Sequence, residues 1–430
     1  KLSIKKIFNL AIENQKKNNF QVAKDLYSQI LRLNPTFHEV YNNLGLIFLA
    51  EGNNKEAKKF FKKAIQINPN LINVLYNLGL VLQKMGDNEE AKKYYKKLIA
   101  INSSIPEAYN NLGVVQSNLG EFKEAINNYD LAIKNNKNFS NAKENLISSL
   151  TCSDSDNHNP IVFANNSLKK LYNKFTLHDL LKGKNLTTFF EKCNEILKNV
   201  NDNIKDIEFI ETQTYRRNTL DLDCKRHHRV FNQERIIPKF CFSCFKIQID
   251  PKNIIDLIKL FFIFDDFKFP NNNWRKCMIE MRSEVKGTYK GFIYCSSFDE
   301  AKIILEDIIP ILKKYIKFKV SIKRGCSEFY RLFPNFKQIN NTENDFMNYE
   351  EKWDAIEKKA DSKENLNKKF MNTLSGLSLS DFLIINNWFN YAKLIEDLSY
   401  KKVSINFIYS KFLENKVASQ IELRRKEFLC

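Results

Sequence analysis

A repeat with a period of 34 residues runs through the first third of the chain. The pair Leu44-Gly45 returns as Leu78-Gly79 and as Leu112-Gly113. Other small and aromatic residues return at the same step: Gly52, Gly86 and Gly120; Ala23, Ala57, Ala91 and Ala125; Tyr27, Phe61, Tyr95 and Tyr129. A unit of this length cannot bury its apolar side alone, so the pattern predicts a stack of units that forms a solenoid.

These positions resemble the consensus of the tetratricopeptide-repeat (TPR) family, in which small residues let two antiparallel helices touch and large residues fill the gap between them. The resemblance covers residues 4–150, although Ser103 and Lys137 stand where a proline is typical. It implies an α-solenoid, a superhelix whose concave groove binds an extended polypeptide or a protein. The expected units are 4–37, 38–71, 72–105 and 106–139, followed by a closing helix at 140–150.

An asparagine occupies the sixth position of every unit, on the helix that lines the groove in TPR proteins. In proteins of this family, such a row clamps the main chain of an extended peptide. An amide side chain both donates and accepts, so it can bind any peptide group, and each net hydrogen bond contributes about 0.5–1.5 kcal/mol. The alternative is chance, because 25 of the first 150 residues are asparagine. The predicted peptide-binding residues are Asn9, Asn43, Asn77, Asn111 and Asn145.

The rest of the sequence shows no resemblance to a family that we can name. Residues 151–166 are polar and contain a proline, which predicts a linker. We expect a helical and basic connecting region at 167–239, an α+β domain at 240–330 and a helical tail at 350–430.

The α+β domain is predicted from an alternation of strand and helix patterns. Its order, βαββαβ, is that of the ferredoxin-like split unit. The expected strands are 240–249, 275–282, 289–295 and 319–324, and the expected helices are 251–264 and 297–315.

Two short motifs have the ligand types and spacing of a zinc site. Cys224-x2-His227 is followed by Cys241-x2-Cys244, and four such ligands can hold a structural zinc ion. Against this interpretation, a strand through Cys241 and Cys244 would point them to opposite faces, and cysteine is also a good small core residue. Cys326, on a turn after the last strand, is a candidate reactive thiol without an identifiable base.

One face of the expected sheet interleaves lysines with aromatic residues, as single-stranded RNA modules do. The run that carries Lys290, Phe292 and Tyr294 resembles part of the RNP1 signature of RNA-recognition motifs. The alternative is that helices cover this face. The net charge of +18 does not decide between these two interpretations, because it is spread along the chain, with 21 Lys/Arg against 13 Asp/Glu in residues 1–150.

The sequence therefore favours a cytoplasmic adaptor or scaffold that binds a peptide or protein client. One alternative is an enzyme whose repeats deliver a client to a cysteine- or metal-dependent site in 200–330, and another is an RNA-binding adaptor. Glycine-rich phosphate loops and the common hydrolase motifs are missing from the sequence. Nine cysteines without the dense spacing of a secreted domain indicate a reducing compartment. The longest apolar stretch, Ile254–Phe264, is too short and too charged for a membrane span.

Overall fold

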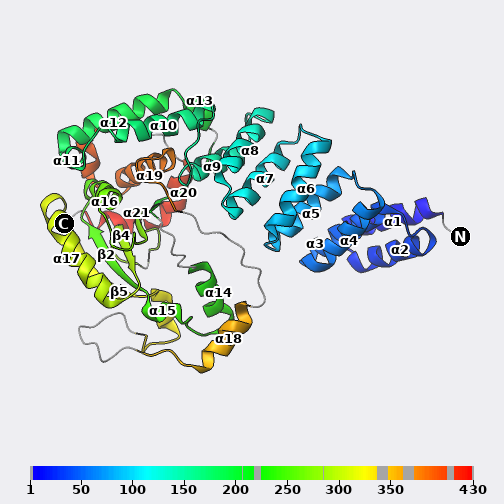
Figure 1. Cartoon of the computed structure of the whole chain (residues 1–430). Coiled ribbons are helices and arrows are strands. Elements are labelled where there is room, and N and C mark those ends of the chain that lie inside the picture. The colour runs from blue at the N-terminus through cyan, green and yellow to red at the C-terminus, as the bar shows by residue number, and fades with distance from the viewer. Residues whose placement is uncertain are drawn as a thin grey trace. The chain divides into compact units, whose positions relative to one another are not determined.

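The chain forms two compact units, one of residues 1–145 and one of residues 146–363 and 370–430 (Figure 1). The structure is a computed structural model, and it describes residues 3–205, 207–216, 224–283, 285–336, 347–361, 372–403 and 411–428. Among these residues, no helix is both long enough and apolar enough to cross a membrane.

The first unit is a solenoid of paired helices, as the 34-residue period predicts. Each of α1, α3, α5 and α7 packs against the even-numbered helix that follows it. The turn glycines Gly52, Gly86 and Gly120 have φ of 77°, 78° and 80°, a left-handed conformation that glycine adopts at no steric cost. The helices are α1 (Ile4–Lys16), α2 (Phe20–Leu33), α3 (His38–Ala50), α4 (Asn54–Ile67), α5 (Ile72–Lys84), α6 (Asn88–Ile101), α7 (Pro106–Leu119), α8 (Phe122–Asn135) and α9 (Ser140–Ser149).

The recurring glycines on the first helices allow the paired helices to touch. A Cβ atom on Gly79 would lie 2.7 Å from Cε1 of Tyr95, and one on Gly113 would lie 2.6 Å from Cε1 of Tyr129. Both tyrosines are almost fully buried. The periodic small and large residues are therefore the two sides of the same contact between helices.

The first helices of successive repeats also pack against each other, α3 on α5 and α5 on α7. The second helices, α2, α4, α6 and α8, make at most isolated contacts with one another. Helices that approach more closely lie on the inner side of a curved stack. The first helices therefore line the concave side of the solenoid.

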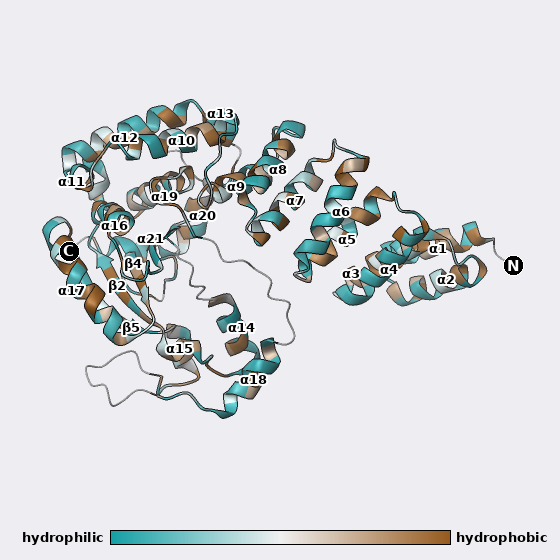
Figure 2. Ribbon diagram, in the orientation of Figure 1, coloured by the Kyte–Doolittle hydropathy of each residue, from teal (hydrophilic) through white to brown (hydrophobic). Residues whose placement is uncertain are grey.

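The second unit is built on an antiparallel sheet with the order β1-β3-β4-β2-β5. Helices α16 (Ile254–Asp266) and α17 (Phe298–Tyr315) pack on one face of this sheet. Ile247 and Ile293 pair in register in this sheet and are fully buried. β2 alternates hydrophobic with hydrophilic residues, and the hydrophobic ones are brown in Figure 2. The strands are β1 (Gln213–Arg216), β2 (Phe245–Pro251), β3 (Arg275–Ile279), β4 (Tyr289–Cys295) and β5 (Phe318–Arg324).

Further helices pack behind α16, and they come from both sides of the sheet segment in sequence. α11 and α19 contact α16 directly, and α10 joins α12 to α19. The predicted helical tail therefore belongs to the core of this unit. These elements are α10 (Pro160–Tyr172), α11 (Leu177–Leu181), α12 (Gly183–Lys198), α13 (Asn201–Ile204), α19 (Leu379–Leu394), η3 (Leu398–Lys402), α20 (Lys411–Val417), η4 (Ala418–Gln420) and α21 (Ile421–Arg425).

The prediction of a linker at 151–166 was wrong for its second half, because α10 begins at Pro160. The side chain of Asn159 accepts a hydrogen bond from the backbone N–H of Ile161, at 2.9 Å. Proline suits the first helical position because that residue has no partner for an N–H group. The proline that indicated a linker thus starts a helix.

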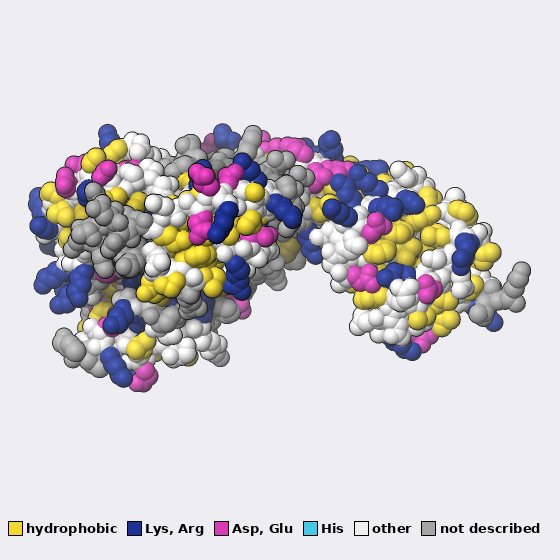
Figure 3. Space-filling model, turned by 90° about the horizontal axis from the view of Figure 1, so that it is seen from below, with side chains coloured by type: hydrophobic (Ala, Val, Ile, Leu, Met, Phe, Trp, Pro, Cys, Tyr) yellow, Lys and Arg dark blue, Asp and Glu magenta, His cyan; other side chains and the backbone are white. Residues whose placement is uncertain are grey.

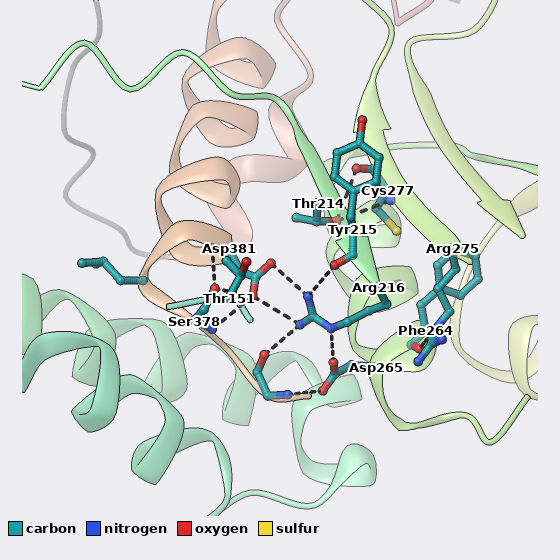
Figure 4. A network of polar contacts seen from close by, with 12 residues as sticks. Thr151, Thr214, Tyr215, Arg216, Phe264, Asp265, Arg275, Cys277, Ser378 and Asp381 are labelled. Atoms are coloured by element: carbon teal, nitrogen blue, oxygen red, sulfur yellow. Dashed lines mark hydrogen bonds and ion pairs between the residues drawn. The ribbon is translucent and has the colours of Figure 1, made fainter. Parts of the chain in front are cut away.

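A buried arginine joins β1, α16 and α19 (Figure 4). Arg216 forms ion pairs with Asp265 and Asp381 and donates a 2.7 Å hydrogen bond to the carbonyl oxygen of Gly376. Burial alone would lower the pKa of Arg216, but the two carboxylates raise it above its ordinary value. This network is internal and fully paired, so it holds the unit together rather than offering a binding site.

A smaller core lies beside the sheet, around α14 (Cys224–Glu234), α15 (Phe240–Ser243), η1 (Ser327–Arg331) and α18 (Lys352–Asp361). Figure 1 shows α14, α15 and α18 together at one end of the unit. The prediction of one strand from 240 to 249 was wrong at its start, because 240–243 form the short helix α15. A short apolar run fits a buried helical turn as well as a strand.

Candidate functional sites

The asparagine row lies on the first helices of the repeats, α1, α3, α5, α7 and α9. Asn9 is exposed, and the other four side chains are half-buried. The row therefore belongs to the helices that line the concave side of the solenoid.

Three of these amides are oriented by hydrogen bonds within the protein. Asn43 Nδ2 donates to Tyr27 Oη at 3.1 Å, and Asn111 Nδ2 donates to Tyr76 Oη at 3.2 Å. Asn145 Nδ2 donates to the side-chain oxygen of Asn110 at 2.9 Å. Burial raises the pKa of Tyr27 to about 12, and the bond from Asn43 opposes that shift. Each Nδ2 has a second hydrogen, so these contacts fix the amides without using up their hydrogen-bonding capacity.

Asn77 differs from its neighbours in the row. The tyrosine that orients Asn43 sits 16 residues earlier, and the equivalent position before Asn77 is Phe61, which has no hydroxyl group. Among the described residues, none forms a side-chain hydrogen bond with Asn77. Among the four half-buried amides of the row, that of Asn77 is therefore the one whose donor and acceptor are most available to a partner.

The structure does not assemble the zinc site that the sequence predicts. No three of Cys224, His227, Cys241 and Cys244, all of them described, have donor atoms within 4.8 Å of one another. His227 instead stacks on the ring of Phe240, with 5.2 Å between the ring centroids. The sequence argument against the site was that a strand would point Cys241 and Cys244 to opposite faces. Cys241 lies on the helical turn α15 instead, so strand geometry is not the reason that the site is missing.

Cys326 lies in the same region of the structure, although the sequence analysis treated it as a separate candidate site. Strands β2 and β5 are antiparallel neighbours, so the start of β2 lies beside the end of β5. The N–H group of Gly325 donates to the carbonyl oxygen of Cys244 at 2.7 Å. The βαββαβ order could have predicted that these two strands are neighbours, because its first and last strands lie side by side in the ferredoxin-like arrangement.

Two half-buried lysines, Lys246 and Lys276, lie on the strands that flank β4. The ammonium groups of Lys246 and Lys276 lie 5.5 Å and 5.3 Å from the centroid of the Phe292 ring. Burial and the neighbouring charge of Lys246 lower the pKa of Lys276 to about 8. The positive charges of both lysines act on the thiol of Cys326 and lower its pKa, against the larger effect of burial.

The predicted RNA-binding residues do not form an open platform. Phe292 is 7% exposed and Lys290 is 2% exposed, and Tyr294 is half-buried. Base stacking needs an accessible ring face, and the two lysine ammonium groups lie over that of Phe292. On the face of the molecule seen in Figure 3, Lys and Arg side chains lie among acidic and hydrophobic ones. These observations argue against the RNA interpretation.

Two cavities of the second unit bear on the alternative that the protein is an enzyme. One, of about 540 Å³, is lined by residues between Asp156 and Val200, and the other, of about 410 Å³, includes Lys259, Lys313 and Lys402. Neither cavity is lined by a cysteine. A cysteine-dependent reaction therefore has no substrate cavity among these two.

Comparison with known proteins identifies the repeats. Two sequence models described as "Tetratricopeptide repeat" match residues 38–71 and 70–138. The comparison with curated proteins gives no match.

Among solved structures, the chain is similar to the following three. The crystal structure of MamA is 18% identical, with 46% of this chain and 94% of that chain covered and a TM-score of 0.34. YrrB, titled "a TPR protein with an unusual peptide-binding site", is 20% identical, with 46% and 86% covered and a TM-score of 0.34. MamA 41-end from Desulfovibrio magneticus RS-1 is 18% identical, with 34% and 82% covered and a TM-score of 0.33.

Proposed function

We propose that this protein is an adaptor whose repeat unit binds an extended segment of a protein partner along its concave side. The observation that carries the proposal is the row of amides on the first helices, three of which are held in place by internal hydrogen bonds. Protein interaction is the common role of TPR solenoids, and the row adds a means of holding main chain.

Fixed amides suit this task because their orientation requires little further ordering when a partner binds. A peptide main chain presents N–H and C=O groups in alternation, and an asparagine can accept from the first and donate to the second. Each net hydrogen bond contributes about 0.5–1.5 kcal/mol, so a few amides together support binding in the micromolar range. Affinity from such contacts depends little on the partner's side chains.

The test uses the full chain as bait in lysate of its native cells, followed by measurement of the dissociation constant for each captured protein. Asn77→Ala removes an amide with no internal hydrogen bond among the described residues, so folding should be unaffected. We expect its dissociation constant to rise roughly tenfold, since about 1–2 kcal/mol of hydrogen bonding is lost.

Asn70→Ala is the matched control, because Asn70 is an exposed asparagine on the turn between α4 and α5. It should bind like the wild type. If Asn77→Ala and Asn70→Ala both bind their partners with unchanged affinity, the amide row is not the binding site.

We also infer that the second unit has a ferredoxin-like core. In the order β3-β4-β2-β5, the four strands of the βαββαβ segment follow the ferredoxin-like arrangement, and β1 extends its edge. We place the adaptor in a reducing, cytoplasmic setting, which suits the buried thiols of Cys193, Cys277 and Cys295.

A further inference from the structure

One cavity of the second unit is lined by five lysines that come from four separate segments of the chain. This cavity has a volume of about 410 Å³. The lysines belong to the middle of α16, the last turn of α17, the link between α17 and β5, and η3. Both α17 and η3 pack against α16, which brings these segments together. The five residues, whose site we call the lysine cavity, are Lys259, Lys313, Lys314, Lys317 and Lys402.

Hydrogen bonds between these segments hold the wall of the lysine cavity in place. The ammonium group of Lys259, a half-buried residue of α16, donates to the carbonyl oxygen of Tyr315 at 3.3 Å. The carbonyl oxygen of Lys402 accepts from the hydroxyl group of Thr187, in α12, at 3.2 Å. The lysines therefore project from main chain whose position is set by other parts of the unit.

The positive charge of the lysine cavity has little negative charge to balance it. In the lining, Asp256 supplies the single carboxylate; it is 7% exposed and accepts a 2.9 Å hydrogen bond from the side chain of Asn253. Burial raises the pKa of Asp256, and the charges of three of the lysines oppose that shift. Among the described residues, no carboxylate forms an ion pair with any of the five lysines. The cavity is thus strongly cationic.

Lysines in other parts of the chain are paired with acidic groups. In the repeat unit, for example, the ammonium group of Lys92 lies 2.6 Å from a carboxylate oxygen of Glu121. Two lysines of the cavity have an ordinary structural explanation, because Lys313 and Lys314 lie in the last turn of α17, where cations interact favourably with the helix dipole. That explanation does not extend to the other three, which lie on α16, on the link before β5 and on η3.

We propose that the lysine cavity binds a small anion that contains two or more linked phosphate groups. Lysine is a common ligand of phosphate, which it contacts as a point charge. A terminal phosphate group carries a charge of about −1.5 to −2 near pH 7. A chain of linked phosphates presents several charges side by side, so it can contact lysines of different segments at once. A single carboxylate would leave most of the ammonium groups without an anionic partner.

The size and the lining of the cavity fit a ligand of this class. Its volume of about 410 Å³ lies within the range of about 300–1,000 Å³ that is typical of small-molecule sites. The lining also includes the apolar residues Leu186, Ile255 and Val403 and the aromatic residue Tyr315. A nucleotide would place its base against these residues, whereas a free polyphosphate would use the lysines alone. Both sources share the phosphate chain.

Isothermal titration calorimetry of the full chain tests the proposal, with tripolyphosphate, ATP and adenosine as ligands and without divalent cations. We expect tripolyphosphate to bind, and adenosine, which has no phosphate, to bind at least about tenfold more weakly. ATP that binds more tightly than tripolyphosphate identifies a nucleotide as the ligand, and ATP that binds equally or less tightly identifies a free polyphosphate. The site lies within the second unit, so these results do not depend on the proposed adaptor function.

Hydrogen exchange read by mass spectrometry locates the bound anion on the chain. Tripolyphosphate should slow exchange in residues 313–317 and in η3, which line the cavity. Exchange in α4, which belongs to the repeat unit, should stay unchanged.

A variant without three of the lysines tests whether the cavity is the site. It carries Lys313→Gln, Lys317→Gln and Lys402→Gln. Its dissociation constant for tripolyphosphate should rise at least about tenfold, because each lost charge weakens the attraction of the anion. The matched control loses the same net charge from exposed positions of α6 and should bind like the wild type. It carries Lys93→Gln, Lys96→Gln and Lys97→Gln.

Asp256→Asn should have the opposite effect and lower the dissociation constant for tripolyphosphate roughly threefold or more, because a negative charge is removed from the lining. Burial already disfavours the charged form of this carboxyl group, so the variant should fold, and far-ultraviolet circular dichroism checks that it does. A purely structural role of Asp256 does not predict tighter binding.

The proposal is overturned if the wild-type chain does not bind tripolyphosphate, or if adenosine binds as tightly. It is also overturned if the α6 control loses as much affinity as the cavity variant, because the anion would then be attracted by the net charge of the whole chain. Slower exchange only outside the residues that line the cavity would overturn it as well.

Discussion

The two units differ in how far along the chain their stabilising contacts reach. In the repeat unit, Asn43 bonds Tyr27 across 16 residues and Asn111 bonds Tyr76 across 35. In the second unit, Arg216 pairs with Asp381 across 165 residues, and Asn165 accepts from the backbone of Leu379 across 214. The first unit is stabilised one neighbour at a time, and the second by contacts that need nearly its whole length.

This difference predicts different responses to damage. A solenoid can lose one contact locally, because each repeat depends chiefly on its neighbours. The second unit should respond as a whole when one long-range contact is removed. Its unfolding can be followed separately, since all three tryptophans, Trp274, Trp353 and Trp388, belong to it.

The largest effect is expected for Arg216→Ala. Removing this guanidinium leaves the Asp265 and Asp381 carboxylates buried without their partner, which costs about 3–5 kcal/mol. Tryptophan fluorescence during urea unfolding should show the loss. The exposed Arg32→Ala in the repeat unit is the control and should leave the tryptophan transition in place. A change below about 1 kcal/mol would contradict the central role of the arginine.

A smaller and local effect is expected for Gly79→Ala. The new methyl group would lie 2.7 Å from the buried Tyr95 ring, and overpacking costs about 1–3 kcal/mol, partly offset by the higher helix propensity of alanine. Hydrogen exchange read by mass spectrometry should rise in α5 and α6 and leave the second unit unchanged. Gly183→Ala, where no atom lies within 4 Å of the new Cβ, is the control. An equal rise of hydrogen exchange in both units would contradict the proposed difference between them.

Two positions of the amide row should separate stability from binding. Asn111→Ala loses the bond to Tyr76 and should lower the free energy of unfolding of the repeats by about 0.5–1.5 kcal/mol. Asn77→Ala should change it by less than about 0.5 kcal/mol. Circular dichroism of the full chain during thermal unfolding provides the measurement. Equal destabilisation by both changes would show that Asn77 is also a structural residue.

The smallest effect concerns acid. Burial alone would raise the pKa of Glu90, but Lys58 and Lys62 lower it to about 2. A carboxyl group whose pKa is lower in the folded than in the unfolded state stabilises the fold at any pH above the unfolded-state pKa. This contribution is lost as the pH falls from about 4.5 towards 2. At this partly exposed position it amounts to about 0.2–1 kcal/mol. Hydrogen exchange around α4 and α6 should therefore depend less on pH in Glu90→Gln than in the wild type. An identical pH dependence in Glu90→Gln and the wild type would contradict a stabilising role of the Glu90 carboxylate.

The repeat unit could be predicted from sequence because its decisive contacts recur at a fixed step. Gly79 and Tyr95 sit 16 residues apart, and the same pair returns 34 residues later as Gly113 and Tyr129. The strand 289–295 was predicted with the bounds that the structure shows. Periodicity within a segment is enough for such elements.

The second unit resisted prediction wherever a residue's role depends on distant partners. Arg216 belongs to the region 167–239, which was predicted as helical, basic and connecting, and nothing near it in sequence indicates Asp265 or Asp381. The burial of Phe292 and Lys290 on the second sheet face likewise depends on residues that strand alternation does not reveal. The asparagine row was predicted by position, but its hydrogen bonds to tyrosines became apparent only in three dimensions.

Site-specific photo-cross-linking of the full chain tests the central claim, that a partner lies along the first helices of the repeats. A photoreactive side chain at position 77, in α5, should cross-link to a captured partner. The same group at position 59, an exposed site on the second helix α4, should give little product. Cross-linking from position 59 with none from position 77 would contradict the account.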